Sequence, residues 1–215
     1  CGAFPFIAGM STTMANMGII YTSSPVFIVI LSVFLFSEKI SLNRIVGLII
    51  CLIGVITIIT KGNFNYLINF SFTTGDFWML GAAIGWALYS IYLLNWKSKF
   101  SLMGRFTLIA FFGFISLFPF YILEESLFFD TKFNSTFLAW VLFAAISPGI
   151  IAFSLYTKVQ RYLGASLTGF TLYLFAVYGA IFGIILFEEM LLPFHYYGGA
   201  LVFAGVYIAR KIKTI

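Results

Sequence analysis

Charged residues are scarce in this sequence of 215 residues. Asp, Glu, Lys and Arg make up 9% of the chain, whereas a soluble domain is about a quarter charged. Hydrophobic residues make up 62%, and the mean hydropathy is +1.07. So few charges cannot cover a water-exposed surface, which excludes a soluble globular protein and indicates that most of the surface faces lipid.

Residues that bind metals are also rare. The two cysteines, Cys1 and Cys51, offer neither a disulfide framework nor metal spacing, and Cys51 lies inside a hydrophobic run as a small core residue. The single histidine, His195, has no neighbouring Cys or Asp and no second His. We therefore expect no metal site and no cofactor.

Basic residues outnumber acidic ones, and the net charge is +5. They are scattered among short loops rather than gathered in a patch. This pattern argues against a nucleic-acid partner and is typical of a protein that is oriented in a membrane. The sequence also contains no ATP-binding motif.

Long hydrophobic runs are what the sequence has in abundance. About 20 apolar residues cross a bilayer as a helix, and the alternating pattern of an outer-membrane barrel is absent. We predict an all-α polytopic membrane protein. Seven full spans are expected, at Ser11–Phe36, Asn43–Thr60, Phe77–Trp96, Phe106–Leu123, Phe137–Thr157, Ser166–Phe187 and Phe194–Ala209.

The connections between these spans alternate between two sides of the membrane, and their basic residues are unevenly divided. The side that holds the C-terminus has ten of the twelve Lys and Arg residues, and the other side has only Lys61 and Lys132. Because basic residues stay in the cytoplasm, we expect a cytoplasmic C-terminus. The first span then enters from outside, so an odd number of helices is expected upstream.

A repeat lies within these hydrophobic runs. At an offset of 151 residues, "PVFIVILSVFLFSE" lies over "AVYGAIFGIILFEE", and nine of 42 positions from Met14 to Val55 are identical. A glutamate is followed after nine and then seven residues by glycines in both copies: Glu38, Gly47 and Gly54, then Glu189, Gly198 and Gly205. Glycines two turns apart let neighbouring helices approach closely, so we assign these four a structural role.

Five helices separate equivalent spans, and five is odd. The two copies are therefore expected to lie upside down relative to each other in the membrane. Inverted repeats are the architecture of transporters that open alternately to the two sides.

The same residues resemble a known family. "PVFIVILSVFLFSEKISLNRIVGLIICLIGV" resembles the fourth and fifth helices of the EamA domain of the drug/metabolite transporter superfamily. "GDFWMLGAAIGWALYSIY" resembles the first helix of that family's second domain, and "LGASLTGFTLYLFAVYGAIFGIILFEEMLLPFHYYGGALVFAGVYIARK" its last two helices. Two departures stand out: Ala176 replaces the family proline, and Ser37 and Glu188 stand where glycine is usual.

The resemblance implies ten helices in two inverted halves of five. Residues 1–61 would then be the remainder of the first repeat, 62–75 an outer linker and 76–215 the second repeat, with the first two helices and most of the third missing. It also implies a secondary transporter in the bacterial inner membrane, which exports or exchanges small organic metabolites such as amino acids or nucleotide-like compounds. Whether the protein forms a homodimer stays open.

Polar residues inside spans are candidates for the transport pathway, because an unpaired polar group in hydrocarbon is costly. The alternative is that they hold helices together or anchor the protein at the interface. Our substrate-binding candidates are Thr12, Asn16, Trp86, Tyr89 and Tyr173.

Prolines within spans are candidate hinges. Pro25 lies midway through the first span, and Pro148 and Gly149 midway through the fifth, where each is expected to bend or break the helix. The alternative is a static kink.

Acidic residues lie only at the ends of spans or in the connections between them. Glu38 and Glu189 precede helices and are expected to accept hydrogen bonds from the first backbone N–H groups of those helices, and Asp76 is expected to act as an N-cap. The alternative is a carboxylate that couples proton movement to transport, which favours an acid at membrane depth.

Two other functional hypotheses remain. A membrane-embedded enzyme would need converging His, Asp, Glu or Arg groups, and none lies within the spans. The chain could also be an inactive piece of a transporter, in which case the isolated 215 residues would not transport.

Overall fold

The computed structural model describes residues 2–63, 65–69, 71–95, 99–127, 134–187, 190 and 192–210. Every regular element in these ranges is a helix, which confirms the predicted all-α class. The chain divides into two compact units, Cys1–Asn95 with Leu163–Ile215 (unit 1) and Trp96–Tyr162 (unit 2). This division follows internal contacts and cuts across the expected second repeat.

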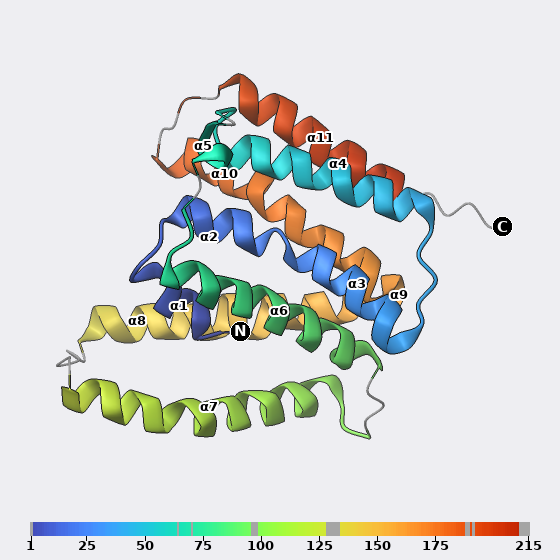
Figure 1. Cartoon of the computed structure of the whole chain (residues 1–215). Coiled ribbons are helices and arrows are strands. Elements are labelled where there is room, and N and C mark those ends of the chain that lie inside the picture. Colours follow the sequence, from blue (N-terminus) through green and yellow to red (C-terminus); the bar gives the residue numbers. More distant parts are fainter. Residues whose placement is uncertain are drawn as a thin grey trace. The chain divides into compact units, whose positions relative to one another are not determined.

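Unit 1 holds most of the helices (Figure 1). Its elements are α1 (Phe4–Gly9), α2 (Met14–Tyr21), α3 (Ser24–Phe36), α4 (Leu42–Ile59), α5 (Asn65–Ile68), α6 (Thr74–Asn95), the end of α9 (Phe153–Gly169), the 3₁₀ helix η2 (Phe170–Tyr173), α10 (Leu174–Phe187) and α11 (Pro193–Arg210). Unit 2 holds α7 (Leu102–Leu127), α8 (Ser135–Ala144), the π-helix η1 (Ala145–Ala152) and the start of α9.

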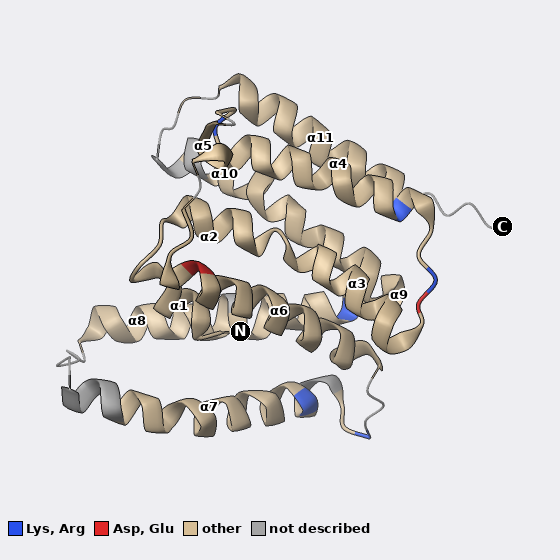
Figure 2. Cartoon of the chain, viewed as in Figure 1, with Lys and Arg blue, Asp and Glu red and all other residues tan. Residues whose placement is uncertain are grey.

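Five segments of the described chain are long and apolar enough to cross a membrane: Met14–Phe36, Leu42–Ile59, Thr74–Asn95, Gly104–Ile122 and Ser135–Phe182. The last has 48 residues and contains most of two expected spans, Phe137–Thr157 and Ser166–Phe187. The seventh expected span corresponds to α11, whose polar first turn contains His195 and which is not among the five. Charged residues lie mainly at helix ends and connections (Figure 2). The chain is a multi-pass membrane protein.

Helices α4 and α11 form the closest helix pair of unit 1 and lie side by side (Figure 1). A Cβ atom at Gly47 would lie 2.5 Å from the Gly205 carbonyl oxygen, and one at Gly54 would lie 2.7 Å from that of Gly198. The start of α4 thus meets the end of α11, so the two helices are antiparallel. Only glycine permits this approach, which brings each backbone against the other.

The α4–α11 contacts have the form of a two-fold axis within the chain. Gly47 and Gly198 are equivalent in the repeat, and so are Gly54 and Gly205. Gly47 contacts Gly205, which is the equivalent of Gly54, and Gly54 contacts Gly198, which is the equivalent of Gly47. Between them, the Cys51 thiol donates a hydrogen bond to the Val202 carbonyl oxygen at 3.4 Å. Residues 51 and 202 are themselves equivalent, because they are 151 apart. Two copies related by a perpendicular two-fold axis meet in this way.

The first expected span is interrupted rather than bent. Helix α2 ends at Tyr21 and α3 begins at Ser24, and Pro25 occupies the first turn of α3. Proline fits there because its missing N–H would have no partner within the helix. The Thr22 and Ser23 hydroxyls donate to the carbonyl oxygens of the preceding turn, each at 2.6 Å. Pro25 therefore stands in the first turn of a new helix, and the helix is broken just before it. Whether this break acts as a hinge stays a prediction.

The equivalent part of the second copy is interrupted differently. The backbone of Gly164 has φ 80° and ψ 167°, which separates the two parts of α9, and the 3₁₀ helix η2 then precedes α10. No proline is needed, since Ala176 stands at the position of Pro25. A Cβ atom at Gly169 would lie 3.7 Å from the Pro25 Cα atom, so the two interrupted helices meet at these positions.

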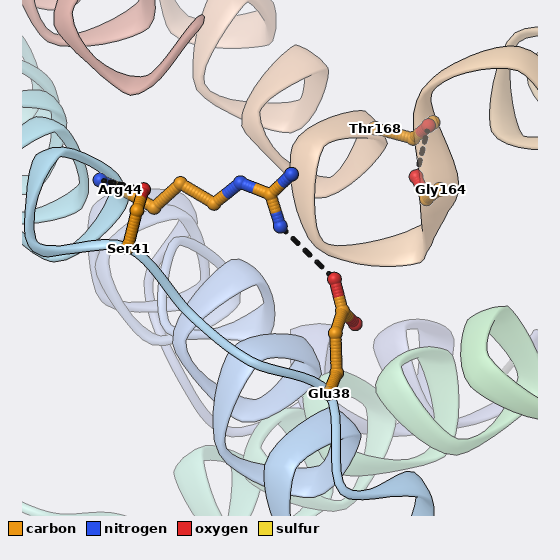
Figure 3. A network of polar contacts seen from close by, with 5 residues as sticks. All are labelled: Glu38, Ser41, Arg44, Gly164 and Thr168. Carbon is orange, nitrogen blue, oxygen red and sulfur yellow. Dashed lines mark hydrogen bonds and ion pairs between the residues drawn. The ribbon is translucent and has the colours of Figure 1, made fainter. Parts of the chain in front are cut away.

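The turn between α3 and α4 explains why glycine is usual at the position of Ser37. Ser37 has φ 53° and ψ 33°, a left-handed conformation that costs a non-glycine residue roughly 1–2 kcal/mol. Ser41, not Glu38, caps α4 by accepting a hydrogen bond from the Arg44 backbone N–H. Glu38 instead pairs with the Arg44 guanidinium at 3.0 Å (Figure 3), so its expected role as a helix cap is wrong. Its repeat equivalent, Glu189, lies outside the described residues.

The predicted break in unit 2 falls within a π-helix. Helix η1 spans Ala145–Ala152 and contains Pro148 and Gly149. A π-helical turn interrupts the regular i to i−4 hydrogen bonds of an α-helix and is one of the known sites of helix kinks. Whether this segment acts as a hinge stays a prediction.

Candidate functional site

A polar pocket of about 800 Å³ lies in unit 1. One wall is the turn between α1 and α2 with the first turn of α2, which contributes Met10, Ser11, Thr12, Thr13 and Asn16. The other wall is the connection between α4 and α6, which contributes Asn63, Asn65, Tyr66, Asn69, Ser71 and Thr73. Apart from Met10, every lining residue carries an uncharged hydroxyl or amide.

The two walls are joined by Tyr66. Its hydroxyl donates to the Asn16 Oδ1 atom at 2.6 Å and lies 3.2 Å from the Thr13 hydroxyl. Thr13 is also the N-cap of α2, where its hydroxyl accepts a hydrogen bond from the Asn16 backbone N–H. Asn16 is 8% exposed, so the amide that holds Tyr66 is itself held in place.

A buried carboxylate lies directly behind the pocket. Asp76 is 0% exposed, and its Oδ1 atom accepts a hydrogen bond from the Thr12 hydroxyl at 2.5 Å. Its Oδ2 atom accepts from the Thr73 backbone N–H at 2.7 Å and from the Thr73 hydroxyl at 3.1 Å. Both donors line the pocket. The expectation of an N-cap is therefore corrected: Asp76 is the third residue of α6 and binds back to the residue before the helix, as in a capping box.

Close backbone packing holds this arrangement together. A Cβ atom at Gly75 would lie 2.5 Å from the Ala8 carbonyl oxygen and 2.8 Å from the Ser11 Oγ atom. The start of α6 therefore lies against the α1–α2 turn, which brings Thr12 within reach of Asp76.

The structure brings together only two of the five predicted substrate-binding residues, Thr12 and Asn16. Trp86 and Tyr89 contact each other, with ring centroids 5.6 Å apart, but do not line the pocket. Tyr173 is 0% exposed and packs in the core with Cys51 and Val55. Its hydroxyl has no hydrogen-bond partner in the described part of the chain.

The residues that sequence reasoning missed come mainly from the 62–75 connection, which we had treated as a linker. Tyr66 and the three asparagines around it are four of the eleven lining residues. Their signal was present in "GNFNYLIN", where three asparagines fall within seven residues. Among the described residues, no group of three or more His, Cys, Asp or Glu could hold a metal ion.

Comparison with known proteins places this fold in a family. The model of the EamA-like transporter family matches residues 3–60 and 73–210. The chain belongs to the EamA-like transporter family. This confirms the resemblance that the two copies of the repeat indicated.

Two relatives carry the name of transporter. An uncharacterized transporter of Methanothermobacter thermautotrophicus is 27% identical over 207 residues, which cover 94% of this chain and 59% of the relative. The uncharacterized transporter YetK of Bacillus subtilis is 26% identical over 197 residues, which cover 92% of this chain and 60% of the relative. The chain thus spans about three-fifths of the length of these relatives.

A solved crystal structure has the same fold. It superposes with a TM-score of 0.76 over 96% of this chain and 70% of the other, at 20% sequence identity. At this identity the likeness shows the fold alone.

Proposed function

We propose that this EamA-like protein is part of a secondary transporter that moves small organic metabolites by opening alternately to the two sides of the membrane. The observation that carries the proposal is the two-fold contact at Cys51 and Val202, with its exchanged glycine pairs. Two inverted halves that meet on a two-fold axis can exchange their conformations, which gives two arrangements that open to opposite sides of the membrane around the same site, and alternating access needs such a pair.

The interrupted helices supply the second support. Broken helices in membrane transporters place backbone and polar side chains where a solute or ion binds. Here α2–α3 and α9–η2–α10 are interrupted at equivalent places and contact each other at Gly169 and Pro25. In the proposal these two interruptions are the moving parts, and the α4–α11 pair is the fixed axis.

The pocket between α2 and the α4–α6 connection is the proposed place where solute first binds. Its lining offers hydroxyl and amide groups rather than the converging acids and bases of an enzyme, which favours binding over chemistry. The distribution of basic residues supports an outer position of this connection and a cytoplasmic C-terminus, and the proposed membrane is a bacterial inner membrane. Lipid and a small-molecule solute are then the partners, without nucleic acid.

A flux measurement tests this function. Vesicles that contain the complete product of the gene are loaded with a deproteinised cell extract, and the medium is followed by mass spectrometry. We expect a small set of metabolites to leave faster than from protein-free vesicles. Identical release from the two kinds of vesicle would contradict the proposal. A Gly198→Ala protein, in which the two-fold contact is disturbed, should release these metabolites more slowly, and Gly199→Ala, whose added Cβ atom meets nothing within 4 Å, is the matched control.

A further inference from the structure

The pocket has a chemical character that narrows its ligand. Ten of its eleven lining residues are Ser, Thr, Asn or Tyr, and the remaining one is Met10. Hydroxyls and amides both donate and accept hydrogen bonds, so they match a solute that does the same with many groups. A charged solute would lose part of its hydration and find no charged side chain among the lining residues, since Asp76 is buried behind them.

Two helix N-termini nevertheless lie at the pocket, and these normally favour anions. Thr13 caps α2, and Thr73 immediately precedes α6; both line the pocket. By this feature alone, the pocket would be expected to attract a carboxylate or a phosphate. The α2 terminus is already occupied in part, because the Thr13 hydroxyl accepts the Asn16 backbone N–H.

The α6 terminus carries its own anion. The buried Asp76 carboxylate accepts the Thr73 N–H at 2.7 Å and the hydroxyls of Thr73 and Thr12 at 3.1 and 2.5 Å. Its exposure is 0%, so a solute in the pocket does not touch it. Its negative charge lies where the helix would otherwise favour a negative group of the ligand.

We propose that this pocket binds uncharged polyhydroxylated solutes, and that the Asp76 carboxylate determines this preference by occupying the anion position at the start of α6. The inference rests on the proposed function in that it names the solute class of the same pocket. Asp76 acts through the helix terminus and the two threonines, so it is a positioning residue and not a ligand of the solute.

Three solutes with one carbon skeleton test the preference. Sorbitol, gluconate and glucamine differ at one end, which is an alcohol, a carboxylate and an ammonium group. Equilibrium binding to the complete gene product in detergent is measured with radiolabelled sorbitol, and the other two compete. We expect sorbitol to bind at least about tenfold more tightly than either charged analogue, a ratio in the range of a charge at a helix end. Equal or tighter binding of gluconate or glucamine, or no sorbitol binding, overturns the proposal.

Two variants test the role of Asp76. In Asp76→Asn the amide keeps a hydrogen-bond acceptor but loses the charge, so the preference for sorbitol over gluconate should fall to about threefold or less. Asp76→Glu keeps the charge and should keep the preference. A purely structural role predicts weaker binding of all three solutes with an unchanged ratio, which would contradict the assignment. If Asp76→Asn does not fold, the sorbitol-to-gluconate ratio of the unaltered protein still tests the preference, and loss of that ratio in a folded Asp76→Glu, which keeps the charge, contradicts the role of Asp76.

Binding and transport can fail separately. Sorbitol selectivity without metabolite release from vesicles would leave the pocket inference standing and remove the transport function. Metabolite release together with tighter binding of gluconate than of sorbitol would support the transport function and remove the pocket inference.

Discussion

Helices α4 and α11 are equivalent in the repeat, and they contact each other symmetrically. Cys51 lies opposite its equivalent Val202, Gly47 lies against Gly205, and Gly54 lies against Gly198. The helices that precede them in each copy do not match. In the first copy, two α-helices are separated at Thr22 and Ser23, with Pro25 in the turn that follows. In the second, a 3₁₀ helix from Phe170 to Tyr173 takes that place without proline.

The comparison shows that the α4–α11 contact has the same structure in both copies, whereas the structure of the interrupted helices differs between them. A contact in which backbone lies on backbone has no room for adjustment, because any added atom overlaps. An interrupted helix whose broken hydrogen bonds are replaced by Thr22, Ser23, Thr168 and Thr171 hydroxyls can exist in more than one form. In the proposed mechanism the axis therefore lies at the matched contact, and movement is proposed at the interrupted helices.

The largest expected effect comes from breaking the matched contact. A Cβ atom at Gly198 would lie 2.5 Å from the Ile58 Cγ1 atom and 2.7 Å from the Gly54 carbonyl oxygen, so Gly198→Ala should destabilise the fold by about 1–3 kcal/mol. Unfolding in mixed detergent micelles with increasing dodecyl sulfate measures this.

The neighbouring glycine is the control. A Cβ atom at Gly199 would meet nothing within 4 Å, so Gly199→Ala should leave stability unchanged or raise it by up to about 1 kcal/mol. Equal losses in the two variants would show that the α4–α11 contact does not depend on backbone proximity.

The cap of α4 should have a smaller effect. Ser41→Ala removes the hydroxyl that accepts the Arg44 N–H and should cost about 1 kcal/mol. Replacing the surface acid, in Glu38→Gln, should cost less than about 1 kcal/mol, because the Glu38–Arg44 pair is partly exposed. The same unfolding assay compares them, and a larger loss for Glu38→Gln would restore Glu38 as the cap.

The turn that joins the interrupted helix to α4 offers a gain in stability. Ser37 is held in a left-handed conformation at φ 53°, so Ser37→Gly should stabilise the protein by up to about 1 kcal/mol after the added flexibility of the unfolded chain is counted. Ser37→Ala keeps the strain and should give no gain, which makes it the control for the loss of the hydroxyl.

The smallest effect concerns Pro25. Because the second copy is interrupted with Ala176 in the equivalent place, Pro25→Ala should leave the first interruption intact and cost only about 0.4–1 kcal/mol, mainly through the unfolded chain. Amide hydrogen exchange at Thr22 to Phe27 reports the interruption. Strong new protection there, as in one continuous helix, would mean that proline alone causes the break.

Sequence patterns predicted the helices and the close packing of the glycine-bearing ones, but neither the pairing of α4 with α11 nor the pocket. Apolar runs and the spacing of Gly47 and Gly54 recur within single helices, so the polytopic fold and the approach of two glycine helices could be predicted from them. The pocket depends on a connection folding back onto another helix, as Tyr66 does onto Asn16. No periodic pattern records such a contact.

The burial of Asp76 could not be predicted from the sequence for a related reason. At a span end, an acid is expected to be at the water interface and to cap its own helix. Its burial comes from the neighbouring α1–α2 turn, which packs on Gly75 and brings Thr12 to the carboxylate. Likewise the left-handed Ser37 could be anticipated only from the glycine that is usual at that position, since serine itself gives no sign of it.

The inversion of the two halves is the central claim, and one labelling measurement tests it directly. Lys39 and Met190 are equivalent in the repeat, follow α3 and α10, and are both exposed, Met190 by 78%. Single cysteines are placed there, in Lys39→Cys and Met190→Cys, with Cys1 replaced by serine and the buried Cys51 kept. A membrane-impermeant maleimide should label position 39 only from the cytoplasmic face and position 190 only from the opposite face. Labelling of both positions from one face would contradict the inverted repeat and the transport mechanism built on it.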